Sequence, residues 1–353
     1  MSILEVRNIS HNFDKKSLAQ LTDISFILEK GEILSLIGPS GTGKSTLLNI
    51  ILGTLVADSG EVFFDDELIA SPTYRNQEQL KHFAYVPQVS TLDFDKTIFE
   101  NISSPLIGLE DEITITNSVR DMIEIFGLEY KDHKLPGDLS AGQRQRVEFA
   151  KAMVSGPKVL LLDEPFSNLD QFLKEEVISE VFPIFRERGL SVVFVSHNLD
   201  EAFSISDRAM VLAHGKVQQV AGPREVYANP STVFVARFTG KINLLASNVL
   251  SAHGDETVVK NSLGEFHVTG KTAPEGKKFI YLAIRPENVQ LGEKGQIAGR
   301  VKHIDYRGDR QFIHIATNDR NKFIVSRPGT EIYKLDQKLR VTIPVEHSFF
   351  LPI

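Results

Sequence analysis

A phosphate-binding pattern lies near the amino-terminal end of this chain. Its residues are Gly38, Pro39, Ser40, Gly41, Thr42, Gly43, Lys44 and Ser45. They fit the pattern G-x-x-x-x-G-K-S/T, in which backbone N–H groups surround the phosphates of a nucleotide. The glycines let the backbone approach the phosphates, Lys44 supplies a cation for the β and γ oxygens, and Ser45 offers a hydroxyl to Mg²⁺. A helix that begins here directs its N-terminus at the same anion.

The flanking segments support this interpretation against a chance match. Residues 33–37 are apolar and are typical of a buried strand that enters the loop. Apolar residues follow the loop at helical spacing: Leu47, Leu48, Ile51 and Leu55. A phosphate loop alone is compatible with a kinase, a GTPase or an ATPase, so other residues must decide between these classes.

The length and charge of the chain indicate two parts with different partners. A chain of 353 residues is long for a single core and predicts two domains. The net charge of −7 argues against general attraction to nucleic acid. Residues 1–240 carry 22 Lys and Arg against 34 Asp and Glu, a net charge of −12. Residues 241–353 carry 17 against 12, a net charge of +5.

Several kinds of chemistry are excluded by composition. The sequence has no cysteine, which excludes disulfides, thiolate zinc sites and thiol nucleophiles. Residues 1–7 show no signal-peptide pattern, and no apolar run approaches the ~18 residues that a membrane helix needs. We therefore expect a soluble polypeptide, whose membrane role, if it has one, comes through a partner.

Strand and helix patterns alternate over the first two thirds of the chain. Strand patterns occur within residues 3–30, at 61–65 before an Asp65-Asp66 turn, and at 83–86, 159–162 and 191–195. Helical patterns cover 97–134, about 140–154 and 170–188, whereas 71–81 is predicted as a polar loop. Nearly all-apolar strands that alternate with helices predict an α/β fold with a parallel sheet covered on both faces. The block 97–134 interrupts this alternation and indicates an inserted helical subdomain, about residues 90–157.

The pattern changes after Gly240. Residues 279–284 and 311–316 are predicted strands, and apolar residues alternate cleanly at Leu339, Val341, Ile343 and Val345. We therefore predict domains at 1–239 and 240–353, the second all-β and in the form of a small barrel. Residues 231–238 could form a last helix of the first domain.

The order of the polar motifs resembles that of the ATP-binding cassette (ABC) ATPases. The phosphate loop is followed by Gln88, by Leu139–Gln143, by an apolar strand ending in Asp163-Glu164, by Ser167–Asp170 and by His197. The five-residue signature, about twenty positions before the strand that ends in Asp-Glu, is the most specific element. The resemblance covers the whole first domain. It implies a P-loop NTPase fold with a mixed or parallel sheet, ATP and Mg²⁺ as cofactors, and ATP hydrolysis.

The resemblance also implies a role for each residue. Phe13 matches the aromatic that stacks on adenine, and Thr46 joins the loop residues in binding the nucleotide. Asp163 matches the Walker B aspartate that holds Mg²⁺ with Ser45, and Glu164 matches the carboxylate that polarises the attacking water. Without the resemblance, the alternative for Phe13 is a partly buried aromatic at a strand end, and an isolated Asp-Glu after a strand is more often a solvated strand end.

Two further residues gain their meaning from their position in the motif order. Gln88 resembles the glutamine that reaches Mg²⁺ and water while sensing a membrane partner, and His197 resembles the histidine that contacts the γ-phosphate. Alone, either one would be an ordinary loop residue. With Lys44 and Glu164 they complete the predicted catalytic set.

The signature residues imply a dimer. Ser140 and Gln143 stand in the S-x-x-Q relation of a capping box, which predicts that a helix starts there. In the ABC family this helix start binds the γ-phosphate held by the other subunit, and Asp170 lies in a loop that passes between the subunits. The usual signature has glycine where Ala141 stands, whereas Gly142 is kept. A methyl group at Ala141 is tolerable if its φ is negative.

The second part resembles the OB-like TOBE domain of ABC import ATPases for sugars, polyamines, ferric iron and related solutes. The resemblance rests on residues 283–289, AIRPENV, and on Tyr306-Arg307-Gly308. It implies a homodimer on the cytoplasmic side of the inner membrane, bound to a permease that an external solute-binding protein feeds. Arg285 and Glu287 are as compatible with a turn salt bridge as with ligand contact.

Other classes of protein fit less well. A soluble, non-transport ABC ATPase with a nucleic-acid- or regulator-binding β domain is the main alternative. Such proteins usually have two cassettes or a coiled-coil insertion, and the β segment has no aromatic and basic cluster, so we expect no nucleic acid partner. A small-molecule kinase would not need Leu139–Gln143, and an exporter would fuse membrane helices to the cassette.

Overall fold

The computed structural model describes residues 1–12, 20–254, 256–270, 273, 276–292, 295–317 and 321–353. The chain forms two compact units, Met1–Arg224 and Glu225–Ile353, and each is described by itself. No helix in the described part of the chain is long and apolar enough to span a membrane.

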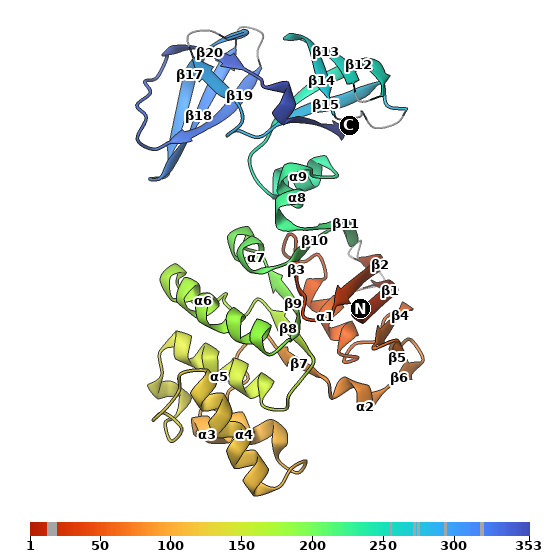
Figure 1. Ribbon diagram of the computed structural model, residues 1–353, viewed down its shortest axis with the longest axis vertical. Helices are drawn as coiled ribbons and strands as arrows, with labels where there is room; N and C mark the ends of the chain where they lie inside the picture. The colour runs from red at the N-terminus through yellow and green to blue at the C-terminus, as the bar shows by residue number, and fades with distance from the viewer. Residues whose placement is uncertain (13–19, 255, 271–272, 274–275, 293–294, 318–320) are drawn as a thin grey trace. The chain divides into compact units, whose positions relative to one another are not determined.

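The first unit mixes strands and helices (Figure 1). Its strands are β1 (Ser2–Asn12), β2 (Gln20–Glu29), β3 (Ile33–Ile37), β4 (Ser59–Phe64), β5 (Glu67–Ser71), β6 (Tyr74–Arg75), β7 (Phe83–Val86), β8 (Val159–Asp163), β9 (Ser191–Ser196), β10 (Arg208–Ala213) and β11 (Lys216–Ala221). Its helices are α1 (Lys44–Ile51), α2 (Gln77–Leu80), α3 (Ile98–Ser103), α4 (Glu112–Ile125), α5 (Ala141–Met153), α6 (Gln171–Glu187) and α7 (Leu199–Ile205).

A six-stranded sheet forms the centre of this unit, in the order β11-β10-β3-β9-β8-β7. β10, β3, β9, β8 and β7 are parallel, and β11 is an antiparallel edge strand. Both faces are buried, because Leu160 and Leu162 of β8 join one apolar core and Leu161 joins the other. This arrangement confirms the predicted α/β fold, with a mixed sheet.

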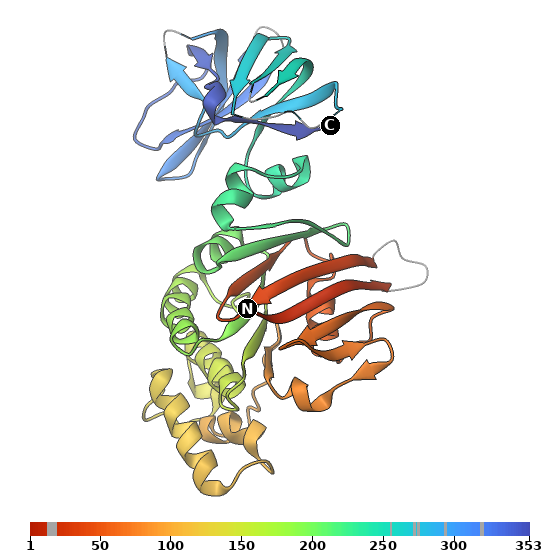
Figure 2. The ribbon, with the colours of Figure 1, turned by 45° about the vertical axis from the view of Figure 1, so that its right-hand side comes forward.

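Different elements cover the two faces of the central sheet. α3, α4, α5 and α6 contribute to the core on one face, whereas α1 and the strands β1, β2, β4 and β5 contribute to the other. β2-β1-β4-β5-β6 form a second, antiparallel sheet, in which β1 lies between β2 and β4 (Figure 2). The predicted turn between β4 and β5 is present, and both Asp65 (φ 46°) and Asp66 (φ 63°) have positive φ.

Two details of the predicted elements differ from the structure. α1 ends at Ile51, so Leu55 lies beyond the helix. The segment 71–81 is not all loop, since it contains β6 and α2. Asn76 caps α2 by accepting hydrogen bonds from the N–H groups of Glu78 and Gln79, which explains how a polar segment forms a short helix.

The second unit contains α9 (Val233–Phe238) and most of α8 (Pro223–Ala228), followed by strands. One antiparallel sheet has the order β14-β13-β12-β15-β21, and the other has the order β16-β20-β17-β18-β19. These strands are β12 (Asn243–His253), β13 (Glu256–Asn261), β14 (Gly264–Thr269), β15 (Phe279–Ile284), β16 (Gln290–Gly292), β17 (Ile297–Tyr306), β18 (Arg310–Thr317), β19 (Lys322–Pro328), β20 (Lys338–Thr342) and β21 (Ser348–Pro352). Apolar residues of both sheets share one core, as expected for an all-β domain.

Arg285 explains why α8 and α9 belong to the second unit. Its side chain is only 2% exposed and donates hydrogen bonds to the carbonyl oxygens of Tyr227, Ala236 and Lys241 and to the hydroxyl of Thr239. Its guanidinium also lies over the Tyr227 ring, 4.0 Å from the centroid. These contacts tie both helices to the residue after β15, so the unit boundary falls earlier in the chain than the predicted 239/240.

The buried guanidinium therefore has a structural role. Glu287 does not pair with it but accepts a 2.7 Å hydrogen bond from the Tyr227 hydroxyl. Burial, and then this carboxylate, raise the pKa of Tyr227 to about 12. The contacts of Arg285 are thus made within the protein, to the ends of two helices.

We predict that Arg285→Met destabilises the second unit by about 3 kcal/mol, because buried carbonyl oxygens lose their donors. Arg300→Met is the matched control, since Arg300 is exposed on β17, and it should change stability by less than about 0.5 kcal/mol. Urea unfolding followed by circular dichroism tests both variants. Equal midpoints for the two would contradict the structural role of Arg285.

Candidate functional site

The phosphate loop joins β3 to α1 and depends on its glycines. A Cβ atom on Gly38 would lie 2.1 Å from the carbonyl oxygen of Leu212, so only glycine allows the loop to leave β3 beside β10. Gly41 (φ 77°) and Gly43 (φ 94°) are in the left-handed region. Gly43 caps α1 without a side chain that binds the first N–H groups, so these groups remain available to an anion.

Lys44 lies at the centre of this loop. Its ammonium group donates 2.9 Å hydrogen bonds to the carbonyl oxygens of Gly38 and Pro39, and the residue is 5% exposed. Burial lowers the pKa of Lys44, while the nearby carboxylates of Glu164 and Asp163 oppose this shift. A phosphate would give this buried cation a partner of opposite charge.

Asp163, at the end of β8, is 3% exposed and faces the loop. The Ser45 hydroxyl donates to its Oδ1 at 3.0 Å, and the Tyr85 hydroxyl donates to its Oδ2 at 3.2 Å. Burial raises the pKa of Asp163 above its ordinary value of 3.8, although both hydroxyls partly offset this effect. The structure therefore brings Ser45 and Asp163 together, and it adds Tyr85, which no sequence pattern indicated.

Glu164 contacts two of the other predicted catalytic residues, Gln88 and His197. Gln88 Nε2 donates to its Oε2 at 3.2 Å, and His197 Nδ1 lies 3.0 Å from the same oxygen. Glu164 has a positive φ of 47°, which is uncommon for a residue with a side chain and marks a sharp turn after β8. Its backbone N–H donates to the carbonyl oxygen of Val195, which fixes the turn against β9.

The sheet topology explains this convergence. Gly38, Gln88, Glu164 and His197 follow the strands β3, β7, β8 and β9 respectively, and these four strands are neighbours. Because the strands are parallel, their carboxyl ends share one edge of the sheet, where ligands bind in open α/β sheets. Residues from four distant segments therefore meet at one place.

An open hollow of about 460 Å³ lies at this edge, lined by residues of the phosphate loop, by Thr46 and by Gln88 and Glu164. Among the described residues, no group of three or more His, Asp or Glu side chains is arranged to hold a metal by itself. Ser45, Gln88 and Asp163 supply oxygen ligands of the kind that Mg²⁺ prefers, and nucleotide phosphates would complete the set. The residues present therefore fit a magnesium ion bound together with a nucleotide.

The signature forms the start of α5, with both bonds of a capping box. Gln143 N–H donates to Ser140 Oγ at 3.3 Å, and Ser140 N–H donates to Gln143 Oε1 at 3.1 Å. Ala141 is the first residue of α5, and its φ is not positive, so the backbone there tolerates a methyl group in place of the usual glycine. Gly142 packs closely on α6, since a Cβ there would lie 3.3 Å from Val177. None of these described residues lines the hollow at the phosphate loop.

One other predicted residue lies apart from this cluster. Asp170 caps α6, and its Oδ1 accepts hydrogen bonds from the N–H groups of Phe172 and Leu173. Phe13 lies outside the described residues, so the predicted adenine contact remains a prediction.

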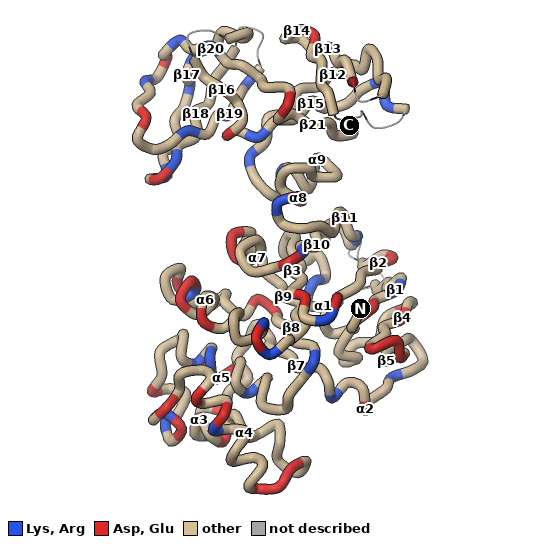
Figure 3. The backbone as a smooth tube through the Cα atoms, in the orientation of Figure 1, with Lys and Arg blue, Asp and Glu red and all other residues tan. Residues whose placement is uncertain are grey.

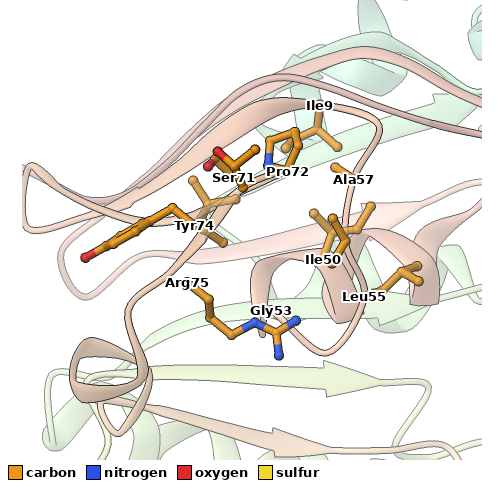
Figure 4. A pocket seen from close by; sticks show the side chains of 13 residues that line it. Ile9, Ile50, Gly53, Leu55, Ala57, Ser71, Pro72, Tyr74 and Arg75 are labelled. Atoms are coloured by element: carbon orange, nitrogen blue, oxygen red, sulfur yellow. The ribbon is translucent and has the colours of Figure 1, made fainter.

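A second hollow, of about 190 Å³, lies elsewhere in the first unit (Figure 4). Its walls come from β1, the end of α1 and the segment from β4 to β6, and they include Ile50, Leu55, Tyr74 and Arg75. It shares no residue with the hollow at the phosphate loop. It is therefore separate from the nucleotide site.

The parallel sheet, the phosphate loop at its carboxyl edge and the adjacent carboxylates define a P-loop nucleotide hydrolase. Comparison with known proteins narrows this class. The family model "ABC transporter" matches residues 21–167, and the model "TOBE domain" matches residues 282–351.

Relatives match most of the chain. The spermidine/putrescine import ATP-binding protein PotA of Fusobacterium nucleatum is 35% identical over 91% of this chain and 87% of its own length. The Fe(3+) ions import ATP-binding protein FbpC of Haemophilus influenzae is 32% identical over 90% of each chain. The structure of cbiO1 from Clostridium perfringens, part of an ABC transporter complex, has a TM-score of 0.59 and 27% identity over 65% of this chain and 91% of that one. The chain belongs to the ATP-binding proteins of ABC transporters, and it is an ATPase.

We predict that Asp163→Asn stabilises the nucleotide-free protein by about 1 kcal/mol at pH 7, since a buried carboxylate is removed. The raised pKa means that the folded state disfavours the charged carboxyl, so wild-type stability falls as pH rises from about 3.8 through the raised value. The gain in stability from Asp163→Asn is therefore absent below about pH 3.8 and complete above the raised pKa of Asp163. Thermal unfolding at several pH values measures it. Asp95→Asn, at an exposed position, should show no such gain.

Proposed function

We propose that this chain is the ATP-binding and ATP-hydrolysing subunit of an ABC importer. The observation that carries the hydrolytic part is the convergence of Gln88 and His197 on one oxygen of Glu164, beside the phosphate loop. A carboxylate held in this way can orient a water molecule and accept its proton. The names of the relatives support the import part.

The roles of the residues follow from their positions. Lys44 and the free N–H groups of the loop and α1 bind the β- and γ-phosphates, and Thr46 lies beside them. Ser45, Asp163 and Gln88 hold Mg²⁺, which neutralises phosphate charge when it is bound. Glu164 orients the attacking water, and His197 fixes that carboxylate and reaches toward the γ-phosphate. Phe13 stacks on the adenine ring.

The active form is a homodimer. The signature residues Ser140–Gln143 lie away from the hollow at their own phosphate loop, so their N–H groups are available to the nucleotide of a second copy. Two bound ATP molecules then close the dimer, and hydrolysis reopens it, because the γ-phosphate bridges the two surfaces. Asp170, which holds the start of α6, lies in the segment between the subunits.

The partners of the dimer are membrane permease subunits, fed by an extracytoplasmic solute-binding protein. The chain is then peripheral to the cytoplasmic side of the inner membrane. Relatives named for polyamine and for Fe(3+) import match almost equally well, so the proposal extends to import in general and leaves the solute open. A soluble, non-transport ATPase is less favoured, because relatives over most of the chain are named as import proteins.

Uptake by reconstituted vesicles tests the proposal. The chain is combined with its permease and binding protein, and uptake of spermidine or of ferric ion is measured with ATP inside. We predict that Lys44→Ala lowers both ATP binding and uptake at least 100-fold, because the loop loses its buried cation. A Lys44→Ala chain that drives normal uptake would refute the assigned site, and an ATP-independent wild-type complex would refute the function.

We also predict that Glu164→Gln hydrolyses ATP at least 100-fold more slowly and accumulates as an ATP-bound dimer. Glutamine keeps the size of the side chain but cannot accept the proton of water. Light scattering coupled to gel filtration, with saturating MgATP, measures the mass of the variant. A monomer under these conditions would contradict the dimer mechanism.

A further inference from the structure

Glu148 is a buried carboxylate on α5 that the proposed mechanism does not use. It is 5% exposed and accepts three hydrogen bonds. Its Oε1 accepts from the Ser90 hydroxyl at 2.5 Å and from the Thr91 N–H at 2.7 Å. Its Oε2 accepts from the Thr91 hydroxyl at 3.0 Å. The donors are uncharged, so a buried charge is held here entirely by the segment that follows Gln88.

Lys151 makes a second contact between α5 and the same segment. It lies three residues after Glu148, on the same side of the helix. Its ammonium group donates to the carbonyl oxygen of Thr91 at 2.8 Å. Ser90 Oγ also accepts from the N–H of Leu92 at 3.3 Å, which gives the segment a fixed turn. We call Ser90, Thr91, Glu148 and Lys151 the Glu148 clamp.

The clamp lies between two functional parts of the first unit. On one side, Gln88 is two residues before Ser90 and donates to the carboxylate of Glu164. On the other side, α5 begins at the capping box of Ser140 and Gln143. The segment 88–92 is therefore held by hydrogen bonds both at Gln88 and at the clamp. Because these bonds leave the segment little freedom, a displacement at one end moves the other end.

We propose that Glu148 is a positioning residue for ATP hydrolysis, which holds Gln88 against Glu164 and links it to the start of α5. This inference rests on the proposed function, which assigns the roles of Gln88 and of the signature residues. Glu148 does not line the hollow at the phosphate loop, and it acts through the segment 88–92. Loss of the clamp slows the chemical step while nucleotide binding by the phosphate loop persists.

Kinetics of the 353-residue chain test this role. Glu148→Ala should lower kcat about tenfold and leave KM for ATP within about twofold, since Gln88 acts on the reaction rather than on nucleotide binding. Glu148→Gln should restore most of the rate, because serine and threonine hydroxyls can accept as well as donate. Ser90→Ala combined with Thr91→Val removes two of the three contacts from the other side and keeps that of the Thr91 N–H, so its effect should be smaller than that of Glu148→Ala and should not add to it.

Glu32 supplies a matched control. It is also a buried carboxylate, 7% exposed, and it accepts from the Glu29 N–H and pairs with Arg208, far along the chain from Gln88. Glu32→Ala should lower only the fraction of folded protein, with kcat per folded molecule unchanged. If Glu148→Ala behaves in the same way as Glu32→Ala, Glu148 is merely structural and the proposal is overturned.

The absence of cysteine allows a readout that does not depend on ATP. Val89, adjacent to Gln88, is 76% exposed, and Val89→Cys can carry a nitroxide label. Its electron paramagnetic resonance spectrum should show about twofold faster motion in Glu148→Ala than in wild type, and no change in Glu32→Ala. Identical spectra would overturn the clamp. A wild-type chain that fails to hydrolyse MgATP would instead refute the proposed function, while these spectra still decide whether the clamp exists.

Discussion

The first unit must hold two adjacent carboxylates beside a site for a polyanionic nucleotide. Its net charge is negative, and acidic residues are frequent on α6 and α7 (Figure 3). Attraction for phosphate must therefore come from local groups, which are Lys44 and the uncapped N-terminus of α1. Asp163 and Glu164 repel each other, and burial raises the pKa of Asp163. A divalent cation removes this conflict, which explains why nucleotide and metal would bind together.

The parallel sheet is what makes such a concentration of charge possible. β8 places Asp163 in the buried strand and turns sharply at Glu164, so the two carboxyl groups have different surroundings. Asp163 receives hydroxyl donors from β7 and α1, whereas Glu164 receives Gln88 and His197 from the segments after β7 and β9. Adjacent residues thereby become suited to different tasks, one to binding a cation and the other to orienting water.

Much of this arrangement could be predicted from the sequence, because local patterns carry it. The apolar strand before Asp163 and the S-x-x-Q pattern at Ser140 are local signals, and the structure has the strand and the capping box that they predict. The short helix α2, which follows Asn76, could not be predicted, because a helix of one turn has no periodicity to detect. The roles of Tyr85, Glu148 and Arg285 could not be predicted, since each depends on partners at least 44 residues away in sequence.

Arg285 and Glu148 illustrate what sequence motifs omit. Arg285 belongs to the segment that resembles the TOBE domain, yet its donors are used within the protein to hold the ends of α8 and α9. Glu148 belongs to no motif, yet it holds the segment that carries Gln88, one of the proposed catalytic residues. Both are buried charged groups that are fully hydrogen-bonded, and such groups fix one geometry because any displacement leaves a charge without its partners. In this protein, buried charge therefore has a positioning role in both units, and in the first unit it joins the signature helix to the site of hydrolysis.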